Sequence, residues 1–192
     1  IIFVIAQERF SRGQLHGGIV GTLMSNLGLE KALSKRGIPF VRAQVGDRYV
    51  LETLKQKEWK IGGEPSGHIV CLDKTTTGDG VVSALQVLVS MIKQNKTLRE
   101  LVQEMELVPQ KLINIKTIQP SVLIKDRRVV ESIKQFNLAM QDQGRVLLRP
   151  SGTEPMLRLM VEGFDEEKVN QHAEILRQVI VDVEGNFVKS SS

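Results

Sequence analysis

Apolar residues recur along the first half of the chain with two different spacings. A spacing of three and four residues, typical of an amphipathic helix, predicts helices over residues 1–10, 27–35, 48–57, 81–94 and 97–106. Short apolar runs bounded by Gly, Pro or polar residues predict buried strands over residues 18–24, 39–44, 59–61 and 69–72. Strands that alternate with helices predict a wound α/β domain built on a mixed sheet. Because residues 1–10 start inside an apolar periodic run, we expect this domain to be incomplete at its N-terminus.

The pattern changes after Pro109. Strands are predicted over residues 112–118, 144–148 and 157–161, and helices over residues 125–141 and 166–183. Strands that return next to one another, with helices between them, predict a small α+β domain with an antiparallel sheet. We therefore predict two domains, residues 1–108 and residues 109–192.

The composition is that of a soluble globular protein and narrows the choice of partner. The chain has 192 residues, of which 41% are apolar and 25% are charged. Its net charge of +4 comes from basic residues interleaved with 22 acidic ones, and aromatic residues make up only 4%. These features disfavour nucleic acid and favour a small anionic substrate. The sequence has no apolar stretch long enough to span a membrane, no secretion signal and only one cysteine, Cys71. We therefore expect a cytoplasmic protein that has no membrane partner.

Residues 149–155 form a polar stretch between two apolar runs, and its side chains suit a phosphate group. Arg149 can donate two charge-assisted hydrogen bonds, and the hydroxyls of Ser151 and Thr153 can donate further ones. Gly152 lets backbone N–H groups approach an anion. An ordinary hairpin loop is the alternative, since Pro, Ser and Gly are common in turns.

A second polar loop, residues 62–68, suits the hydroxyl groups of a sugar. The carboxylate of Glu64 can accept hydrogen bonds from two adjacent hydroxyls, and Ser66 can add one more. His68 has a side chain suited to proton transfer near neutral pH. A tight turn with a solvated Glu64 and a structural His68 explains the same residues.

These two loops resemble a known family. Residues 149–155, Arg-Pro-Ser-Gly-Thr-Glu-Pro, resemble the C-terminal phosphate-binding loop of the α-D-phosphohexomutase superfamily, and residues 63–68, Gly-Glu-Pro-Ser-Gly-His, resemble its sugar-binding loop. Together with residues 21–28, Gly-Thr-Leu-Met-Ser-Asn-Leu-Gly, they point to the branch that acts on glucosamine phosphates. The resemblance covers essentially the whole chain. It implies that residues 1–108 are a sugar-binding third domain without its metal loop, and that residues 109–192 are the phosphate-binding C-terminal domain.

The resemblance also implies roles for single residues. It makes Glu64 and Ser66 the residues that hold the sugar hydroxyls, and it places His68 near the reacting centre as the catalytic residue. It directs Arg48 toward the substrate. A helix cap by Asp47, with Arg48 exposed to solvent, explains that stretch equally well.

Two further positions have both a family role and a plainer one. Arg158 lies on the strand after the phosphate loop, where it can join Arg149 around the phosphate or remain an exposed strand residue. The family places residues 77–80 near the site, but Asp79 directly precedes the helix predicted from Val81. We therefore interpret Asp79 as a helix cap.

The resemblance implies a bacterial isomerase that interconverts glucosamine 6-phosphate and glucosamine 1-phosphate, on the route to UDP-N-acetylglucosamine and the cell wall. The reaction would use a phosphoserine, a bisphosphorylated sugar and Mg²⁺, and the full-length enzyme could be a homodimer. The Ser-His and Asp-Gly-Asp-Gly-Asp motifs of the phosphoserine and metal loops do not occur in the sequence, and residues 78–80 supply one carboxylate. We therefore predict no metal site in this chain and no activity of the chain alone.

Two alternatives stay open at this stage. The first is the corresponding part of a phosphomannomutase or phosphoglucomutase, since the superfamily shares both loops and differs in the sugar that it accepts. The second is a non-catalytic module that binds sugar phosphates.

Overall fold

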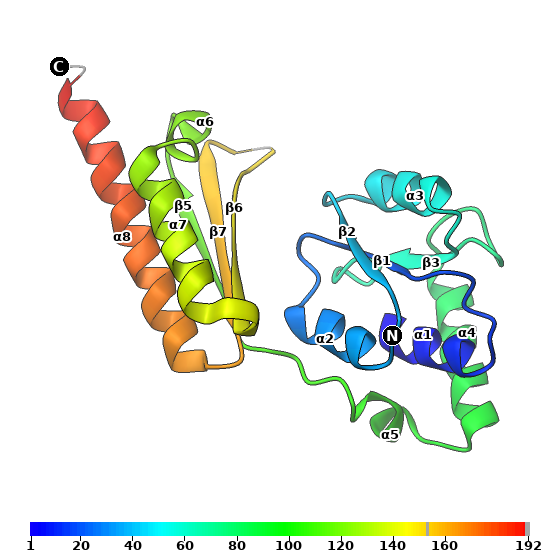
Figure 1. Ribbon diagram of the computed structural model, residues 1–192. Helices are drawn as coiled ribbons and strands as arrows, with labels where there is room; N and C mark the ends of the chain where they lie inside the picture. Colours follow the sequence, from blue (N-terminus) through cyan, green and yellow to red (C-terminus); the bar gives the residue numbers. More distant parts are fainter. Residues whose placement is uncertain (153, 191–192) are drawn as a thin grey trace. The chain divides into compact units, whose positions relative to one another are not determined.

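The computed structural model describes residues 1–152 and 154–190, which form two compact units that divide between Leu107 and Val108 (Figure 1). Unit 1 comprises residues 1–107 and unit 2 begins at Val108. Each has a hydrophobic core of its own.

Unit 1 is built on a four-stranded mixed sheet. Its strands are β1 (Ile19–Thr22), β2 (Phe40–Ala43), β3 (Ile61–Gly63) and β4 (Ile69–Cys71), in the order β2-β1-β3-β4. Strand β1 pairs in parallel with β2 and β3, and β4 pairs antiparallel with β3. The helices are α1 (Ile2–Ser11), α2 (Leu27–Lys35), α3 (Asp47–Gln56), α4 (Gly80–Gln94) and α5 (Leu98–Val102). The predicted α/β class and mixed sheet are confirmed.

The sheet of unit 1 is covered on both faces. Ile19 and Val20 are neighbours on β1, and successive side chains of a strand point to opposite faces. Ile19 packs with α1 and α2 through residues such as Phe3 and Leu33, whereas Val20 packs with α3 through Val50. Helices thus cover both faces of the sheet. Because β1, β2 and β3 are parallel, they end at the same edge, and folds of this kind bind ligands at that edge.

Unit 2 is a small α+β domain, also as predicted. Its strands are β5 (Gln110–Lys116), β6 (Gly144–Pro150) and β7 (Met156–Gly163), all antiparallel, in the order β5-β7-β6. The helical segments are α6 (Pro120–Leu123), α7 (Arg127–Met140), the short 3-10 helix η1 (Gln141–Gln143) and α8 (Glu166–Ser190). Helices α7 and α8 lie side by side against one face of the sheet (Figure 1).

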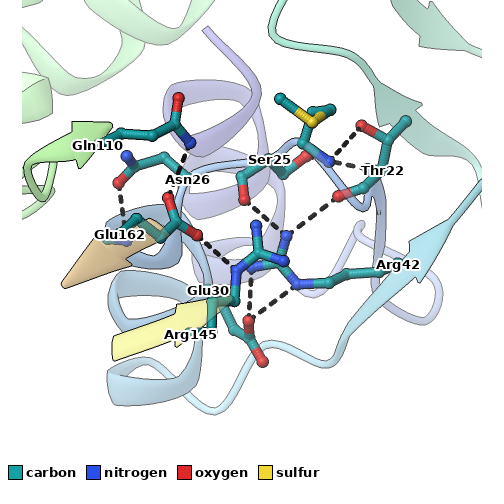
Figure 2. A network of polar contacts seen from close by, with 10 residues as sticks. Thr22, Ser25, Asn26, Glu30, Arg42, Gln110, Arg145 and Glu162 are labelled. Carbon is teal, nitrogen blue, oxygen red and sulfur yellow. Dashed lines mark hydrogen bonds and ion pairs between the residues drawn. The ribbon is translucent and has the colours of Figure 1, made fainter. Parts of the chain in front are cut away.

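One end of this sheet contains a buried charge. The side chain of Glu162 is fully buried, and its two carboxylate oxygens accept hydrogen bonds from Arg145 at 2.5 Å and Gln110 at 3.0 Å (Figure 2). A buried carboxylate is costly unless it is paired in this way. The pairing joins all three strands at the end of the sheet opposite to residues 149–156.

Several element boundaries differ from the sequence predictions. Helix α3 begins at Asp47 itself, its N-cap is Gly46, and no side chain caps it, so the capping role predicted for Asp47 is wrong. Strand β6 continues to Pro150, so Arg149 lies on a strand rather than in a loop. Helix α6 was not predicted, and α8 continues past Val183 to Ser190. Among the described residues, no helix is both long and apolar enough to cross a bilayer.

Candidate functional site

The loop between β3 and β4 is a hairpin turn closed by its own backbone. The N–H of Glu64 donates to the carbonyl of His68 at 2.9 Å, and the N–H of Gly67 donates to the carbonyl of Glu64 at 3.1 Å. Ser66 lies at the exposed tip between them. The backbone thus holds the side chains of Glu64 and His68 at the two ends of one short loop.

A second loop is tied to this one at the same edge of the sheet. The N–H of Gly46 donates to Oε1 of Glu64 at 2.8 Å, and Nδ1 of His68 contacts Oδ2 of Asp47. Side-chain ligand atoms of Asp47, Glu64 and His68 lie within 4.8 Å of one another. The His68 side chain is 45% exposed, so this polar cluster is open to solvent.

Arg48, the next residue of that loop, does not join the cluster. Its side chain is 82% exposed, and its Nε donates to Oε1 of Glu52 at 2.8 Å, one turn further along α3. The hydrogen bond and the negative charge of Glu52 raise the pKa of the Arg48 guanidinium. The described structure therefore places Arg48 in a surface ion pair.

The turn after β1 is held by Arg42, a residue that the sequence analysis did not single out. Its guanidinium donates to the carbonyls of Thr22 at 3.0 Å and Ser25 at 2.6 Å, and it also pairs with the carboxylate of Glu30 at 2.7 Å (Figure 2). Asn26 caps α2 by accepting from the N–H of Gly28. The signal in the sequence was a lone arginine within the apolar strand β2.

A cavity of about 300 Å³ lies between this turn and the hairpin loop. Such a volume is at the lower end of the range for small-molecule sites. Polar groups come from Ser25, Asn26 and Glu64, whereas most of the wall is apolar. The apolar part is formed mainly by Ile1, Ile2, Phe3, Leu29, Ile69, Met105 and Leu107.

In unit 2, two arginines face each other across the sheet. Arg149 on β6 and Arg158 on β7 are directly opposite partners in the antiparallel register. Burial, followed by the positive charge of Arg158, lowers the pKa of the Arg149 guanidinium. Like charges directly opposite in a sheet destabilise it, so this pair favours an anion between the two side chains.

Several polar atoms around this pair lack partners among the described residues, although Nη1 of Arg149 donates to the carbonyl of Pro150 and Nη2 of Arg158 to the carboxylate of Glu154, both at 3.4 Å. The Nε atoms of Arg149 and Arg158 and the hydroxyl of Ser151 are buried without a hydrogen bond among the described residues. Gly152 follows at an exposed position with open space where a side chain would stand. Thr153 lies outside the described residues. Buried polar groups are normally hydrogen-bonded, so three unpaired donors side by side indicate a ligand with acceptor oxygens.

Residues 77–80 serve the structure of unit 1. Asp79 accepts from the N–H groups of Val81 at 2.8 Å and Val82 at 2.9 Å, which confirms its predicted role as the cap of α4. Gly78 lies against the ring of His68, because an added Cβ would be 2.5 Å from Cδ2 and Nε2.

The described carboxylates do not fit a magnesium ion, which prefers six oxygen ligands in octahedral geometry. The carboxylate of Asp79 is used for capping. In the cluster of Asp47, Glu64 and His68, one carboxylate oxygen accepts a backbone N–H and another contacts the imidazole. These engaged carboxylates leave too few free oxygen ligands for a magnesium ion.

Comparison with known families matches both units. A family model described as phosphoglucomutase/phosphomannomutase, alpha/beta/alpha domain III, matches residues 1–108. The model of the phosphoglucomutase/phosphomannomutase C-terminal domain matches residues 112–179.

Curated relatives are similar over almost the whole chain. The phosphoglucosamine mutase of Legionella pneumophila strain Corby is 56% identical over 190 residues, which are 99% of this chain and 42% of the relative. That of Yersinia enterocolitica is 54% identical over 88% of this chain and 38% of the relative. The chain thus spans about two fifths of the length of the relatives that it matches.

Solved structures share the fold at low sequence identity. An Aspergillus fumigatus N-acetylphosphoglucosamine mutase in complex with GlcNAc-6P and magnesium has a TM-score of 0.79 at 18% identity, covering 95% of this chain and 43% of that one. A phosphoglucomutase/phosphomannomutase family protein from Burkholderia thailandensis has a TM-score of 0.65 at 16% identity, covering 93% and 40%.

Proposed function

Since the chain belongs to the phosphoglucomutase/phosphomannomutase family, we propose that it forms the substrate-binding part of a phosphoglucosamine mutase. In this proposal residues 1–108 bind the sugar and residues 109–192 bind a phosphate group. The identity of 56% to a phosphoglucosamine mutase over 99% of the chain supports this choice of sugar.

The observation that carries the proposal is the arginine pair of unit 2. Arg149 and Arg158 face each other, and their Nε atoms are buried without a partner among the described residues. A phosphate dianion supplies acceptor oxygens for these Nε atoms and adds negative charge to that of Glu154, which contacts Arg158 at 3.4 Å. Ser151 and Gly152 complete the proposed site with a hydroxyl donor and an unobstructed backbone, and Thr153 would add a second hydroxyl.

The sugar hydroxyls are proposed to bind at the β3–β4 loop of unit 1. Oε1 of Glu64 is oriented by the N–H of Gly46, which leaves Oε2 to accept hydrogen bonds from the sugar. Ser66 at the loop tip can donate or accept another. Arg48 can reach a phosphosugar by leaving its exposed pair with Glu52, since surface ion pairs contribute little stability. His68 is the proposed group for proton transfer.

In the whole protein, we propose that glucosamine 6-phosphate and glucosamine 1-phosphate are interconverted through a bisphosphorylated sugar. The phosphoserine and the magnesium ligands would come from residues outside this chain. Such an enzyme would act in the bacterial cytoplasm and would supply amino sugar for cell-wall precursors. On this proposal the 192-residue chain binds its substrate but does not turn it over.

A hybrid enzyme tests the proposal directly. In this hybrid, the 192-residue chain replaces the matching 42% of the Legionella pneumophila relative. We expect it to convert glucosamine 6-phosphate at a rate close to that of the parent, and to act at least tenfold more slowly on mannose 6-phosphate and glucose 6-phosphate. Faster conversion of either hexose phosphate would favour a phosphomannomutase or phosphoglucomutase instead.

A substitution pair serves as the control for this experiment. Glu64→Gln keeps the size of the side chain and removes the charge-assisted acceptor, so it should lower kcat/KM by about 10- to 150-fold, which corresponds to about 1.5–3 kcal/mol. Glu174→Gln removes an exposed carboxylate on α8 and should leave kcat/KM unchanged. A hybrid that folds and has no mutase activity would refute the proposed function.

A further inference from the structure

We infer that Asp47 is a positioning residue that holds the imidazole of His68 in a single tautomer, with the hydrogen on Nδ1 and the lone pair on Nε2. The geometry carries this inference by itself. Its consequence for catalysis rests on the proposed function.

Asp47 lies in the first turn of a helix, one position after the N-cap Gly46, and it does not cap that helix. Helix α3 begins at Asp47, and no side chain caps its first turn. Instead, Oδ2 contacts Nδ1 of His68, and Oδ1 is buried without a hydrogen-bond partner among the described residues. Because a carboxylate only accepts hydrogen bonds at neutral pH, the contacting Nδ1 must carry the hydrogen. The neutral ring then has its lone pair on Nε2.

Two further contacts keep the ring in this place. Gly78 lies against its Cδ2–Nε2 edge, where a Cβ would approach to 2.5 Å. The loop that carries Asp47 is tied to the loop that carries His68, since the N–H of Gly46 donates to Glu64. The contact between Asp47 and His68 is thus built into the structure by two neighbouring interactions. A surface ion pair formed by chance would have neither.

The chemical consequence concerns a proton. With Nδ1 held by Asp47, Nε2 can accept the proton of a sugar hydroxyl, while the electron pair of the broken O–H bond stays on the oxygen. The resulting imidazolium has its charge next to the carboxylate of Asp47, which stabilises it. In the reverse direction Nε2 returns the proton. The wrong tautomer would present an N–H where the reaction needs an acceptor.

Long-range ¹H–¹⁵N NMR of the 192-residue chain tests the tautomer without any activity. The spectrum is recorded above about pH 8, where an unperturbed imidazole is neutral. The chain has three histidines, so His68→Gln assigns the His68 signals. We expect an unprotonated Nε2 and a protonated Nδ1, and we expect Asp47→Ala to abolish that preference. Glu52→Gln, which removes a carboxylate from the same helix, should leave the spectrum unchanged.

Two results would overturn the inference. The first is a protonated Nε2 in the unsubstituted chain, and the second is an unchanged tautomer in Asp47→Ala. If Asp47→Ala does not fold, the spectrum of the unsubstituted chain still decides. In that case the same-sized Asp47→Asn, whose amide can donate to Nδ1, should shift the hydrogen toward Nε2.

Kinetics of the hybrid enzyme test the consequence for catalysis. Asp47→Ala should lower kcat by about 10- to 100-fold with KM nearly unchanged, and Asp47→Glu should restore part of the loss. Gly78→Ala, which displaces the ring, should act in the same direction. An inactive parent hybrid would refute the proposed function and leave the tautomer assignment to the NMR result. A correct tautomer with an unchanged kcat in Asp47→Ala would refute the positioning role.

Discussion

Arg149 and Arg158, the proposed phosphate-binding pair, are opposed at some cost to the stability of the free protein. They face each other in the register of β6 and β7, and burial together with the neighbouring charge lowers the pKa of Arg149. An arginine with a lowered pKa remains protonated at neutral pH, because the ordinary pKa of a guanidinium lies far above neutrality. The lowered value means that the folded state disfavours the charged form, and a bound anion relieves this.

The first prediction concerns Arg158→Gln. Removing one of two opposed charges should stabilise the free chain by about 0.2–1 kcal/mol, while the increase in Tm produced by inorganic phosphate should largely disappear. Thermal unfolding with and without phosphate measures both effects. Arg177→Gln, on the exposed surface of α8, is the control and should retain the phosphate effect. A variant of lower stability that still responds fully to phosphate would contradict the account.

The second prediction concerns pH. A phosphate monoester loses its second proton with a pKa of about 6, whereas guanidinium groups in proteins generally keep their charge over the neutral range. The affinity of the chain for a sugar phosphate should therefore rise between pH 5 and pH 8 as the dianion forms. Calorimetric titrations at several pH values, with sulfate as an anion whose charge is constant over this range, would check this. An affinity that falls over the same range would show that the dianion is not the bound form.

At this scale the sequence could propose residues for a site but not their contacts. Glu64 and His68 were proposed from one loop, and Arg149 and Ser151 from another, and their roles stay predictions. The contact between Asp47 and His68 was missed, because it joins residues 21 positions apart and a pattern along one segment cannot show it. Asp47 was misread as a cap since the N-cap and the first helical residue differ by only one position.

At the scale of elements, the loops of unit 1 depend on backbone geometry as much as on side chains. Gly46 has a φ of +126°, a conformation that other residues adopt only with strain. This conformation directs its N–H toward Glu64 at the start of α3. The loop that presents Asp47 is therefore specified by a glycine.

The third prediction follows from that glycine. Gly46→Ala should destabilise the chain by about 1–3 kcal/mol through the backbone alone, because an added Cβ would meet only the ring of Tyr49 at an ordinary 3.5 Å. Gly185→Ala is the matched control, since this exposed residue of α8 has open space around it and should stabilise the chain by up to about 1 kcal/mol. Urea unfolding measures both changes. Equal effects of the two substitutions would contradict the account.

The fourth prediction concerns the ion pair between α1 and the residues after β4. The Asp73 carboxylate accepts from Arg9 at 2.8 Å. Burial raises the pKa of Asp73, but the hydrogen bond and charge of Arg9, with help from Lys74, outweigh it and lower the pKa below its usual 3.8. A carboxyl group whose pKa is lower in the folded than in the unfolded chain stabilises the fold at pH values above its unfolded-state pKa. That stabilisation is lost as the pH falls through its folded-state pKa.

Asp73→Asn should therefore reduce the free energy of unfolding at neutral pH and flatten its dependence on pH below about 4. Chemical unfolding from pH 2.5 to pH 7 would measure this. Asp165, an exposed residue directly before α8 whose pKa is also lowered by local contacts, gives a comparison variant in unit 2. If the free energy of unfolding of Asp73→Asn depended on pH below about 4 as strongly as that of the unsubstituted chain, the stabilising role of Asp73 would be contradicted.

Most elements were predictable because their apolar periodicity is strong and their caps are conventional. Helix α2 was predicted at its observed bounds, with a capping Asn26 before it. Helix α6 was missed because its four residues, Pro120–Leu123, are too few to show a period. Strand β6 was predicted too short, because Arg149 is polar and Pro150 is a turn-forming residue. In the structure, pairing with β7 keeps both residues extended.

At the scale of the whole molecule, we propose that the two units divide the recognition of one chemical class of substrate. Unit 1 presents carboxylate, hydroxyl and imidazole groups at the edge where its parallel strands end, and unit 2 presents opposed arginines at the turn of an antiparallel sheet. Family membership and the separate chemistry of each unit both support a sugar phosphate. The central claim is that each unit binds its own part of such a molecule.

Isothermal titration calorimetry of the 192-residue chain tests this claim most directly, with glucosamine 6-phosphate and inorganic phosphate as separate ligands. Losing charge-assisted hydrogen bonds of about 1.5–3 kcal/mol should weaken binding by about 10- to 150-fold. The account predicts that Arg149→Ala weakens the binding of both ligands to this extent, and that Glu64→Gln weakens only that of the sugar phosphate. Phosphate binding that is unchanged in Arg149→Ala, or absent from the unsubstituted chain, would contradict it.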